Sequence, residues 1–196
     1  MKRILLIRHA ESTANVGRKT STPRDIELTD SGHAQALALV SGIPQKPDLI
    51  VTSAYIRTQQ TASPLIARFP DSPQEQWPIH EFTYLSPIRC QDTTIEQRVP
   101  LVMEYWNRCD PDYRDGDGAE SFADFIHRVQ SAMETVKQRP EQFMVLFSHC
   151  LFISAMLWLP GRAIAQIITS DDMECFRQYL FATSISNCKV VEYNPT

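Results

Sequence analysis

Short, uninterrupted apolar segments are the feature that most constrains the fold of this chain. They lie at residues 4–7, 49–51 and 143–147. A strand has this pattern when both of its faces are covered, as in a parallel sheet with helices on either side. The sequence therefore predicts strands at these positions, buried within one mostly parallel sheet.

Amphipathic helical patterns lie between and after the predicted strands. One covers residues 34–40 after the candidate N-caps Thr29, Asp30 and Ser31, and a second covers residues 54–68. In a third, over residues 122–133, apolar side chains recur at intervals of three and four after the candidate cap Ser121. Strands that alternate with helices indicate an α/β fold, and right-handed crossovers place helices on both faces of the sheet.

The length of 196 residues fits one domain with a modest insertion. About residues 82–120 break the strand–helix rhythm, with one predicted helix at 94–109 on which Met103, Tyr105 and Trp106 are expected to form a buried stripe. We interpret this segment as a short, mainly helical cap over one edge of the sheet. The predicted fold is a three-layer α/β/α sandwich with a mostly parallel central sheet, in a single domain over residues 1–196.

The charge balance limits the classes of partner. The net charge is -4 and the pI is about 5.7, so no general basic field would attract nucleic acid or an anionic membrane. The chain has six glycines and no Gly-x-x-x-x-Gly-Lys or Gly-x-Gly-x-x-Gly phosphate loop. An anionic small substrate would have to be bound by a local cationic site.

Cysteine usage and hydropathy predict a cytoplasmic protein. The first apolar run ends at Arg8-His9, far short of a signal peptide, and no stretch reaches membrane-spanning length. The five cysteines are odd in number and widely spaced, which argues against a disulfide framework or a zinc ribbon. The sequence leaves the oligomeric state open.

Two of the predicted strands run directly into a histidine. The first leads into Arg8-His9 and the last into Ser148-His149, and the strand at 49–51 leads into a helix whose first turn carries Arg57. In an open parallel sheet, ligands bind just beyond the carboxyl ends of the strands. These cationic and imidazole side chains are therefore expected to converge on one pocket for an anion, beside helix N-termini that favour phosphate.

The first histidine stands in an extended motif. Residues 8–15, Arg-His-Ala-Glu-Ser-Thr-Ala-Asn, resemble the Arg-His-Gly-Glu-Thr-x-x-Asn signature of the histidine phosphatase, or phosphoglycerate mutase-like, superfamily. Together with the later matches, this similarity spans nearly the whole chain and is much more specific than a lone Arg-His pair. The later matches, in the family's order, are Leu28-Thr29-x-x-Gly32-x-x-Gln35-Ala36, Ser53-x-x-x-Arg57-Thr58-x-Gln60-Thr61-Ala62, Glu81, Gly118-Ala119-Glu120-Ser121 and Ser148-His149.

The resemblance implies a role for each matching residue. It makes His9 the nucleophile that carries the phosphoryl group, and Glu81 the general acid. It also implies that four residues bind the phosphoryl group, namely Arg8, Asn15, Arg57 and His149. The chemistry agrees, since two guanidiniums and a second imidazole can stabilise a transferring phosphoryl group without a metal or cofactor.

Two positions depart from the family pattern, and other residues compete for catalytic roles. Ala10 and Cys150 stand where the family commonly has glycine, and both are interpreted as tolerable variants of the pocket. Other histidines, namely His33, His80 and His127, are expected to be structural or exposed. Rivals to Glu81 as the acid are Asp92, Glu96, Glu104 and the acidic 110–120 stretch.

The predicted function is metal-independent hydrolysis of a small phosphorylated metabolite. Phosphoglycerate mutase activity is the alternative, although Gln97-Arg98 offers one cation where mutases use a basic pair for the substrate carboxylate. Two further alternatives stay open: a phosphatase acting on phosphohistidine in proteins, and a non-catalytic member that binds a phosphorylated ligand. A metal hydrolase is disfavoured because the chain has no His-Glu-x-x-His motif and no paired cysteines.

Overall fold

A mixed five-stranded sheet forms the centre of the molecule. The computed structural model describes residues 2–162 and 167–195. The strands lie in the order β3-β2-β4-β1-β5, in which the first four are parallel and β5 is antiparallel to β1. Their bounds are β1 Arg3–Arg8, β2 Leu49–Thr52, β3 Gln74–Gln76, β4 Phe143–Ser148 and β5 Val190–Tyr193.

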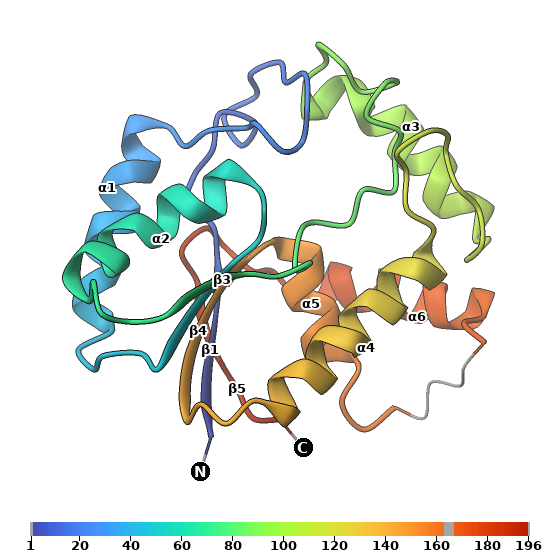
Figure 1. Cartoon of the computed structure of the whole chain (residues 1–196). Helices are drawn as coiled ribbons and strands as arrows, with labels where there is room; N and C mark the ends of the chain where they lie inside the picture. Colours follow the sequence, from blue (N-terminus) through green and yellow to red (C-terminus); the bar gives the residue numbers. More distant parts are fainter. Residues whose placement is uncertain (1, 163–166, 196) are drawn as a thin grey trace.

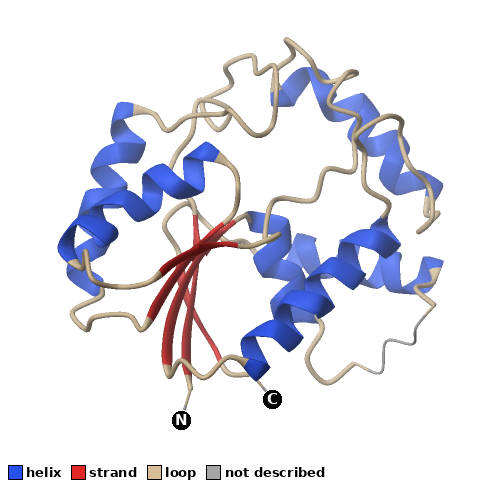
Figure 2. Cartoon of the chain, in the orientation of Figure 1, coloured by secondary structure: helices blue, strands red, loops and turns tan. Residues whose placement is uncertain are grey.

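Helices cover both faces of this sheet and give three layers (Figures 1 and 2). The helices α1 and α2 lie on one face, and α4, α5 and α6 lie on the other. The predicted α/β/α sandwich with a mostly parallel sheet is therefore confirmed. The bounds are α1 Asp30–Leu39, a 3-10 turn at Val40–Gly42, α2 Ile56–Arg68, α3 Ile95–Arg108, α4 Phe122–Gln138, α5 Cys150–Trp158 and α6 Ser170–Ala182.

The continuous apolar pattern of the strands follows from this double covering. Successive side chains of a strand point to opposite faces of the sheet. In β1, Ile4 and Leu6 pack into the cluster that holds α4 and α5, whereas Leu5 and Ile7 pack with Leu65 of α2. Each position is thus buried, and each full burial contributes about 1.5–3 kcal/mol.

The helices begin where the sequence supplies capping side chains. Thr29 accepts a hydrogen bond from the backbone N–H of Gly32 at the start of α1. Ser121 forms a capping box with Asp124 at the start of α4, and Thr94 forms one at the start of α3. These hydrogen bonds satisfy N–H groups that have no partner inside the helix.

The segment from Phe82 to Glu120 carries α3, which lies beyond the carboxyl ends of the strands (Figure 1). It is joined to the loop after β1 by a bridge between Thr20 and Thr93. Tyr105 and Trp106 are buried as predicted, but the expectation for Met103 is wrong because 55% of this residue is exposed. On a helix, residues two apart face different directions, so Met103 and Tyr105 cannot lie in one buried stripe.

Several elements of the structure have no counterpart among the predicted ones, namely β3, β5, α5 and α6. Strand β5 pairs antiparallel with β1 and closes one edge of the sheet. Within residues 2–162 and 167–195, no helix combines the length and apolar character needed to cross a bilayer.

Candidate active site

The sheet topology brings the two motif histidines together. β1 and β4 are adjacent and parallel, with Arg8 in register with Ser148. His9 and His149 therefore emerge at the same edge, with ring centroids 5.2 Å apart. Strand β2 is the other neighbour of β4 and leads into α2, whose first turn carries Arg57.

His9 is held with one ring nitrogen directed to the backbone. It is 5% exposed, and its Nδ1 lies 2.7 Å from the carbonyl oxygen of Ala10. Because a carbonyl oxygen can only accept, Nδ1 carries the proton and Nε2 keeps its lone pair. Burial, with Arg57 and Arg8 nearby, lowers the pKa of His9 well below its usual value. The imidazole is therefore neutral near pH 7.

His149 is fully buried between a guanidinium and a hydroxyl. The guanidinium NH2 of Arg57 lies 3.1 Å from its Nδ1, and Ser53 Oγ lies 2.8 Å from its Nε2. A guanidinium can only donate, so Nδ1 is the acceptor and Nε2 donates to Ser53. Burial, followed by the charge of Arg57, lowers the pKa of His149 well below its usual value.

The two motif arginines supply the positive charge. Arg57 is buried and donates to the carbonyl oxygen of Pro23 at 2.6 Å. Burial lowers its pKa to about 10, so it remains a cation at neutral pH. Arg8 donates to the carbonyl oxygen of Ile185, while its buried Nε has no hydrogen-bond partner in the described structure. An oxyanion bound here would accept a hydrogen bond from this buried donor and would be stabilised by both guanidinium charges.

Asn15 borders the same space with its amide orientation fixed. Its Oδ1 accepts from the backbone N–H of Ser12 at 3.0 Å and from the Ser12 hydroxyl at 2.9 Å. Because the Ser12 N–H can only donate, the oxygen must face Ser12, and the Nδ2 group is directed elsewhere. This arrangement leaves the amide donor available to a bound anion.

Glu81 lies at the N-terminus of α5. Its Oε1 accepts from the backbone N–H groups of Leu151 at 3.0 Å and Phe82 at 3.1 Å. These bonds favour the carboxylate, but burial is the larger effect and raises the pKa of Glu81 above its usual value. A raised pKa increases the fraction of Glu81 that is protonated near neutral pH and can deliver a proton.

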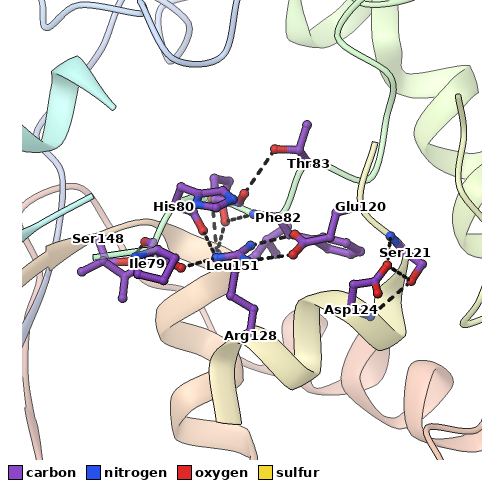
Figure 3. Close-up of polar contacts among 12 residues, drawn as sticks. Ile79, His80, Phe82, Thr83, Glu120, Ser121, Asp124, Arg128, Ser148 and Leu151 are labelled. Atoms are coloured by element: carbon purple, nitrogen blue, oxygen red, sulfur yellow. Dashed lines mark hydrogen bonds and ion pairs between the residues drawn. The ribbon is translucent and has the colours of Figure 1, made fainter. Parts of the chain in front are cut away.

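A polar network fixes the segment that carries Glu81 (Figure 3). Arg128 of α4 forms two 2.7 Å hydrogen bonds with the carboxylate of Glu120 and donates to the carbonyl oxygen of His80 at 2.9 Å. Ser148 donates to the carbonyl oxygen of Ile79 at 2.6 Å. The backbone on the N-terminal side of Glu81 is therefore held by both β4 and α4.

Arg8, His9, Asn15, Arg57 and Glu81 line a cavity of about 310 Å³, which has the size of a small-molecule site. Among the described residues that line it, Glu81 is the one carboxylate, and the predicted rivals Asp92, Glu96 and Glu104 are exposed. Five of the site residues predicted from the sequence border the cavity, namely Arg8, His9, Asn15, Arg57 and Glu81. His149 is not part of the lining but contacts two residues that are, Arg57 and His9.

Neither Ala10 nor Cys150, the two residues that depart from the family motif, is among the residues that line the cavity. Ala10 is fully buried with Leu28 and Ala36, under α1. The Sγ of Cys150 lies 3.9 Å from the carbonyl oxygen of Ile185. Burial raises the pKa of the Cys150 thiol, which disfavours the thiolate that a nucleophile requires.

The other histidines lie apart from the pair formed by His9 and His149. His33 and His127 are exposed. His80 is half-buried against the ring of Tyr55, with ring centroids 5.5 Å apart. Burial, with Arg128 nearby, lowers its pKa to about 4.

Some contacts that hold the site were not predicted. Ser53 belongs to a quoted motif, but its hydrogen bond to His149 depends on the pairing of β2 with β4. Asn187 donates to the carbonyl oxygen of His9 at 2.9 Å, and Ile185 accepts from Arg8. The segment that carries these two residues has no motif or periodicity that would have identified it.

A three-layer α/β protein with paired histidines and arginines at the carboxyl edge of its sheet has the features of a phosphoryl-transfer enzyme. The chain belongs to the histidine phosphatase superfamily, branch 1, whose family model matches residues 4–172. The resemblance predicted from the motifs is therefore confirmed. No curated protein matches the chain in a sequence comparison. Within the described residues, no group of at least three His, Cys, Asp or Glu side chains is arranged to hold a metal.

Solved structures share the fold at low sequence identity. Phosphoserine phosphatase from Entamoeba histolytica has a TM-score of 0.70 and 20% identity, covering 98% of this chain and 90% of that one. A mycobacterial glucosyl-3-phosphoglycerate phosphatase has a TM-score of 0.69 and 24% identity, with 98% and 90% coverage. The α-ribazole phosphatase from Shigella flexneri has a TM-score of 0.68 and 22% identity, with 88% and 84% coverage.

Proposed function

We propose that this protein hydrolyses phosphomonoesters of small metabolites through a phosphohistidine formed on His9. The observation that carries the proposal is the hydrogen bond from His9 Nδ1 to the Ala10 carbonyl oxygen. It leaves the lone pair of Nε2 available for attack, beside the guanidiniums of Arg8 and Arg57. The neutral state of this buried imidazole supports the same role.

In the first step, His9 Nε2 forms a bond to phosphorus as the bond from phosphorus to the ester oxygen breaks. Protonated Glu81 donates its proton to the departing oxygen, so an alcohol leaves and Glu81 becomes a carboxylate. Arg8, Arg57 and Asn15 donate to the phosphoryl oxygens, whose charge is spread over the transition state. His149 keeps Arg57 in place through the 3.1 Å contact.

In the second step, a water molecule attacks the phosphorus and the bond to His9 breaks. The Glu81 carboxylate accepts the proton of this water, so the enzyme returns to its starting state and phosphate is released. The two backbone N–H groups that bind Glu81 stabilise its carboxylate form between the steps. Burial favours the protonated form that the next cycle requires.

We further propose that the reaction needs no metal ion, because Arg8 and Arg57 supply the positive charge at the phosphoryl oxygens. Relatives that share the fold are described as phosphatases of α-ribazole, phosphoserine and glucosyl-3-phosphoglycerate type, which favours hydrolysis. Hydrolysis is also favoured over mutase activity because Arg98, the cation on the cap side of the cavity, is bound to Thr20 and Thr93.

Hydrolysis of p-nitrophenyl phosphate and a panel of phosphorylated metabolites, with and without excess EDTA, tests this function. We expect turnover that EDTA does not reduce, and we expect competitive inhibition by orthovanadate. Loss of activity on chelation with recovery on adding a divalent ion would contradict metal independence. Binding of phosphorylated ligands without turnover would favour the non-catalytic alternative, and turnover only of phosphohistidine peptides would favour the protein-phosphatase alternative.

A further inference from the structure

The cavity continues beyond the phosphate-binding residues into a space between the cap and the loop after β1. We propose that this space binds the organic group of the substrate, and that this group is predominantly hydrophobic, such as an alkyl or aryl group, and not a sugar or a carboxylic acid. The inference rests on the proposed function, because it describes the leaving group of the same reaction.

Apolar side chains form both walls of this space. Pro23 and Ile26 line it from the loop after β1. Leu85, Ile95 and Val102 line it from the cap. The bridge between Thr20 and Thr93 joins the two walls and holds the loop against the cap. The apolar lining is therefore part of a connected structure around the organic group.

Three polar side chains in these walls, Tyr55, Thr83 and Arg98, already have hydrogen-bond partners in the protein. The hydroxyl of Tyr55 lies 3.2 Å from Thr83 Oγ1, which also lies within reach of the Glu81 carbonyl oxygen at 3.3 Å. Arg98 directs Nε to Thr93 Oγ1 at 2.7 Å and NH2 to Thr20 Oγ1 at 2.6 Å. These interactions hold the walls together and reduce the polar groups that a substrate hydroxyl could bind.

This arrangement discriminates by solvation. A hydroxyl that leaves water for such a surface loses hydrogen bonds without replacing them, whereas a methylene gains from burial. Sites that select hydroxylated substrates instead present polar groups that need those hydroxyls as partners. The walls lined by Ile26 and Val102 therefore favour a hydrophobic leaving group.

Matched substrates test the proposal directly. Propyl phosphate and glycerol 3-phosphate share a carbon chain, and the leaving oxygen of glycerol is the more acidic, so intrinsic reactivity favours glycerol 3-phosphate. We expect kcat/KM to be about tenfold or more higher for propyl phosphate. Along n-alkyl phosphates, kcat/KM should rise about fourfold per methylene until the cavity is filled. Equal or better hydrolysis of glycerol 3-phosphate, or no dependence on chain length, would overturn the inference.

Substitutions of lining residues test whether the cavity causes the preference for hydrophobic leaving groups. Val102→Thr should lower kcat/KM for hexyl phosphate by about three- to tenfold relative to kcat/KM for glycerol 3-phosphate. Val99→Thr is the matched control, because Val99 lies on the same helix but is 46% exposed and is not part of the lining. Ile26→Thr tests the opposite wall if Val102→Thr does not fold. Equal effects of Val99→Thr and Val102→Thr would contradict the assignment.

Binding measurements separate this inference from the proposed function. Alkylphosphonates cannot be hydrolysed at their carbon–phosphorus bond in this reaction, so the differences in affinity between them report the space around the organic group. Affinity should rise with alkyl length and should be higher for propylphosphonate than for its dihydroxy analogue. That result without turnover of any phosphomonoester would support the hydrophobic cavity and contradict the proposed function. Turnover of phosphomonoesters with no preference among the phosphonates would support the proposed function and contradict the hydrophobic cavity.

Discussion

The state of His149 is set by hydroxyl groups as well as by Arg57. Thr58 Oγ1 lies 2.7 Å from the Tyr55 carbonyl oxygen, which can only accept, so the Thr58 hydrogen is directed there. Ser53 Oγ lies 2.9 Å from Thr58 Oγ1 and can donate to it, which leaves Ser53 Oγ as the acceptor for His149 Nε2. The hydroxyl pair thus selects the tautomer whose Nδ1 accepts from Arg57.

Ser53 is therefore expected to act as a positioning residue. Ser53→Ala should lower kcat roughly tenfold through loss of one buried hydrogen bond, with a smaller change in KM. Nitrogen-15 NMR of labelled histidine should show a change in the His149 tautomer. Ser72→Ala is the control, since Ser72 is equally buried and donates to the carbonyl oxygen of Pro47. Equal activity loss in both variants, or an unchanged tautomer in Ser53→Ala, would refute the role.

The raised pKa of Glu81 predicts a pH dependence. The protonated acid is required for departure of a poor leaving group, so this activity should fall as the pH rises through the Glu81 pKa. Neutral His9 is required for attack, and its lowered pKa places the loss of activity on the acid side below pH 6.5.

The substitution Glu81→Gln tests the same acid by a different route. It should reduce turnover of an alkyl phosphate by about a hundredfold or more, and that of p-nitrophenyl phosphate much less. Equal losses for both substrates would exclude Glu81 as the acid.

At the level of single residues, the sequence was informative where a motif was present. Arg8, His9, Arg57 and His149 were predicted to converge, and the structure brings them together. The hydrogen bond from Asn187 to the His9 carbonyl oxygen was not foreseen. It depends on β5 returning beside β1, a long-range pairing that no local pattern specifies.

At the level of elements, Gly32 decides how closely α1 approaches the loop after β1, which carries His9. A Cβ added at Gly32 would lie 2.0 Å from the backbone carbonyl oxygen of Glu11. Glu11 follows His9 and Ala10 directly, so displacement of this oxygen would also disturb His9, the proposed nucleophile. The glycine in the predicted Leu-Thr-x-x-Gly motif is thus required by helix–loop packing.

Gly32→Ala should therefore lower the free energy of unfolding by about 2 kcal/mol or more. Gly42→Ala is the matched control, because a Cβ there meets no atom within 4 Å. The control should be neutral or more stable by up to about 1 kcal/mol, through lower entropy of the unfolded chain. Urea unfolding of both variants and the wild type measures the difference. Comparable stability of the two variants would show that the close approach is relaxed at little cost.

The elements that the sequence predicted are those with strong local signals. The strands at 49–51 and 143–147 have continuous apolar residues, and helix α4 has both a cap and an apolar face. By contrast, β3 reads Gln-Glu-Gln, so its strand conformation comes from pairing with β2. Helix α5 is apolar on nearly all sides because it is buried between the sheet and other helices, so it lacks the amphipathic pattern.

At the level of the whole molecule, the site exists because segments distant in the sequence meet at one edge. Strand order places β4 between β1 and β2, so the residues that follow these strands become neighbours. The cap was predicted as an insertion, and a bridge joins it to the loop after β1, with residues of both segments lining the cavity. The sequence could not predict which cap residues line that cavity, because Ile95 and Val102 enter it through tertiary packing.

Trapping of the phosphorylated enzyme tests the central claim most directly. Wild-type protein mixed with a ³²P-labelled substrate and quenched in alkali should retain label that is stable in base, labile in acid and located on His9. His9→Ala should keep its fold, lose turnover and retain no label. Aspartyl phosphates are cleaved by alkali and serine phosphates survive acid, so this stability identifies phosphohistidine. Label on His149 or Cys150, or near-normal turnover by His9→Ala, would contradict the mechanism.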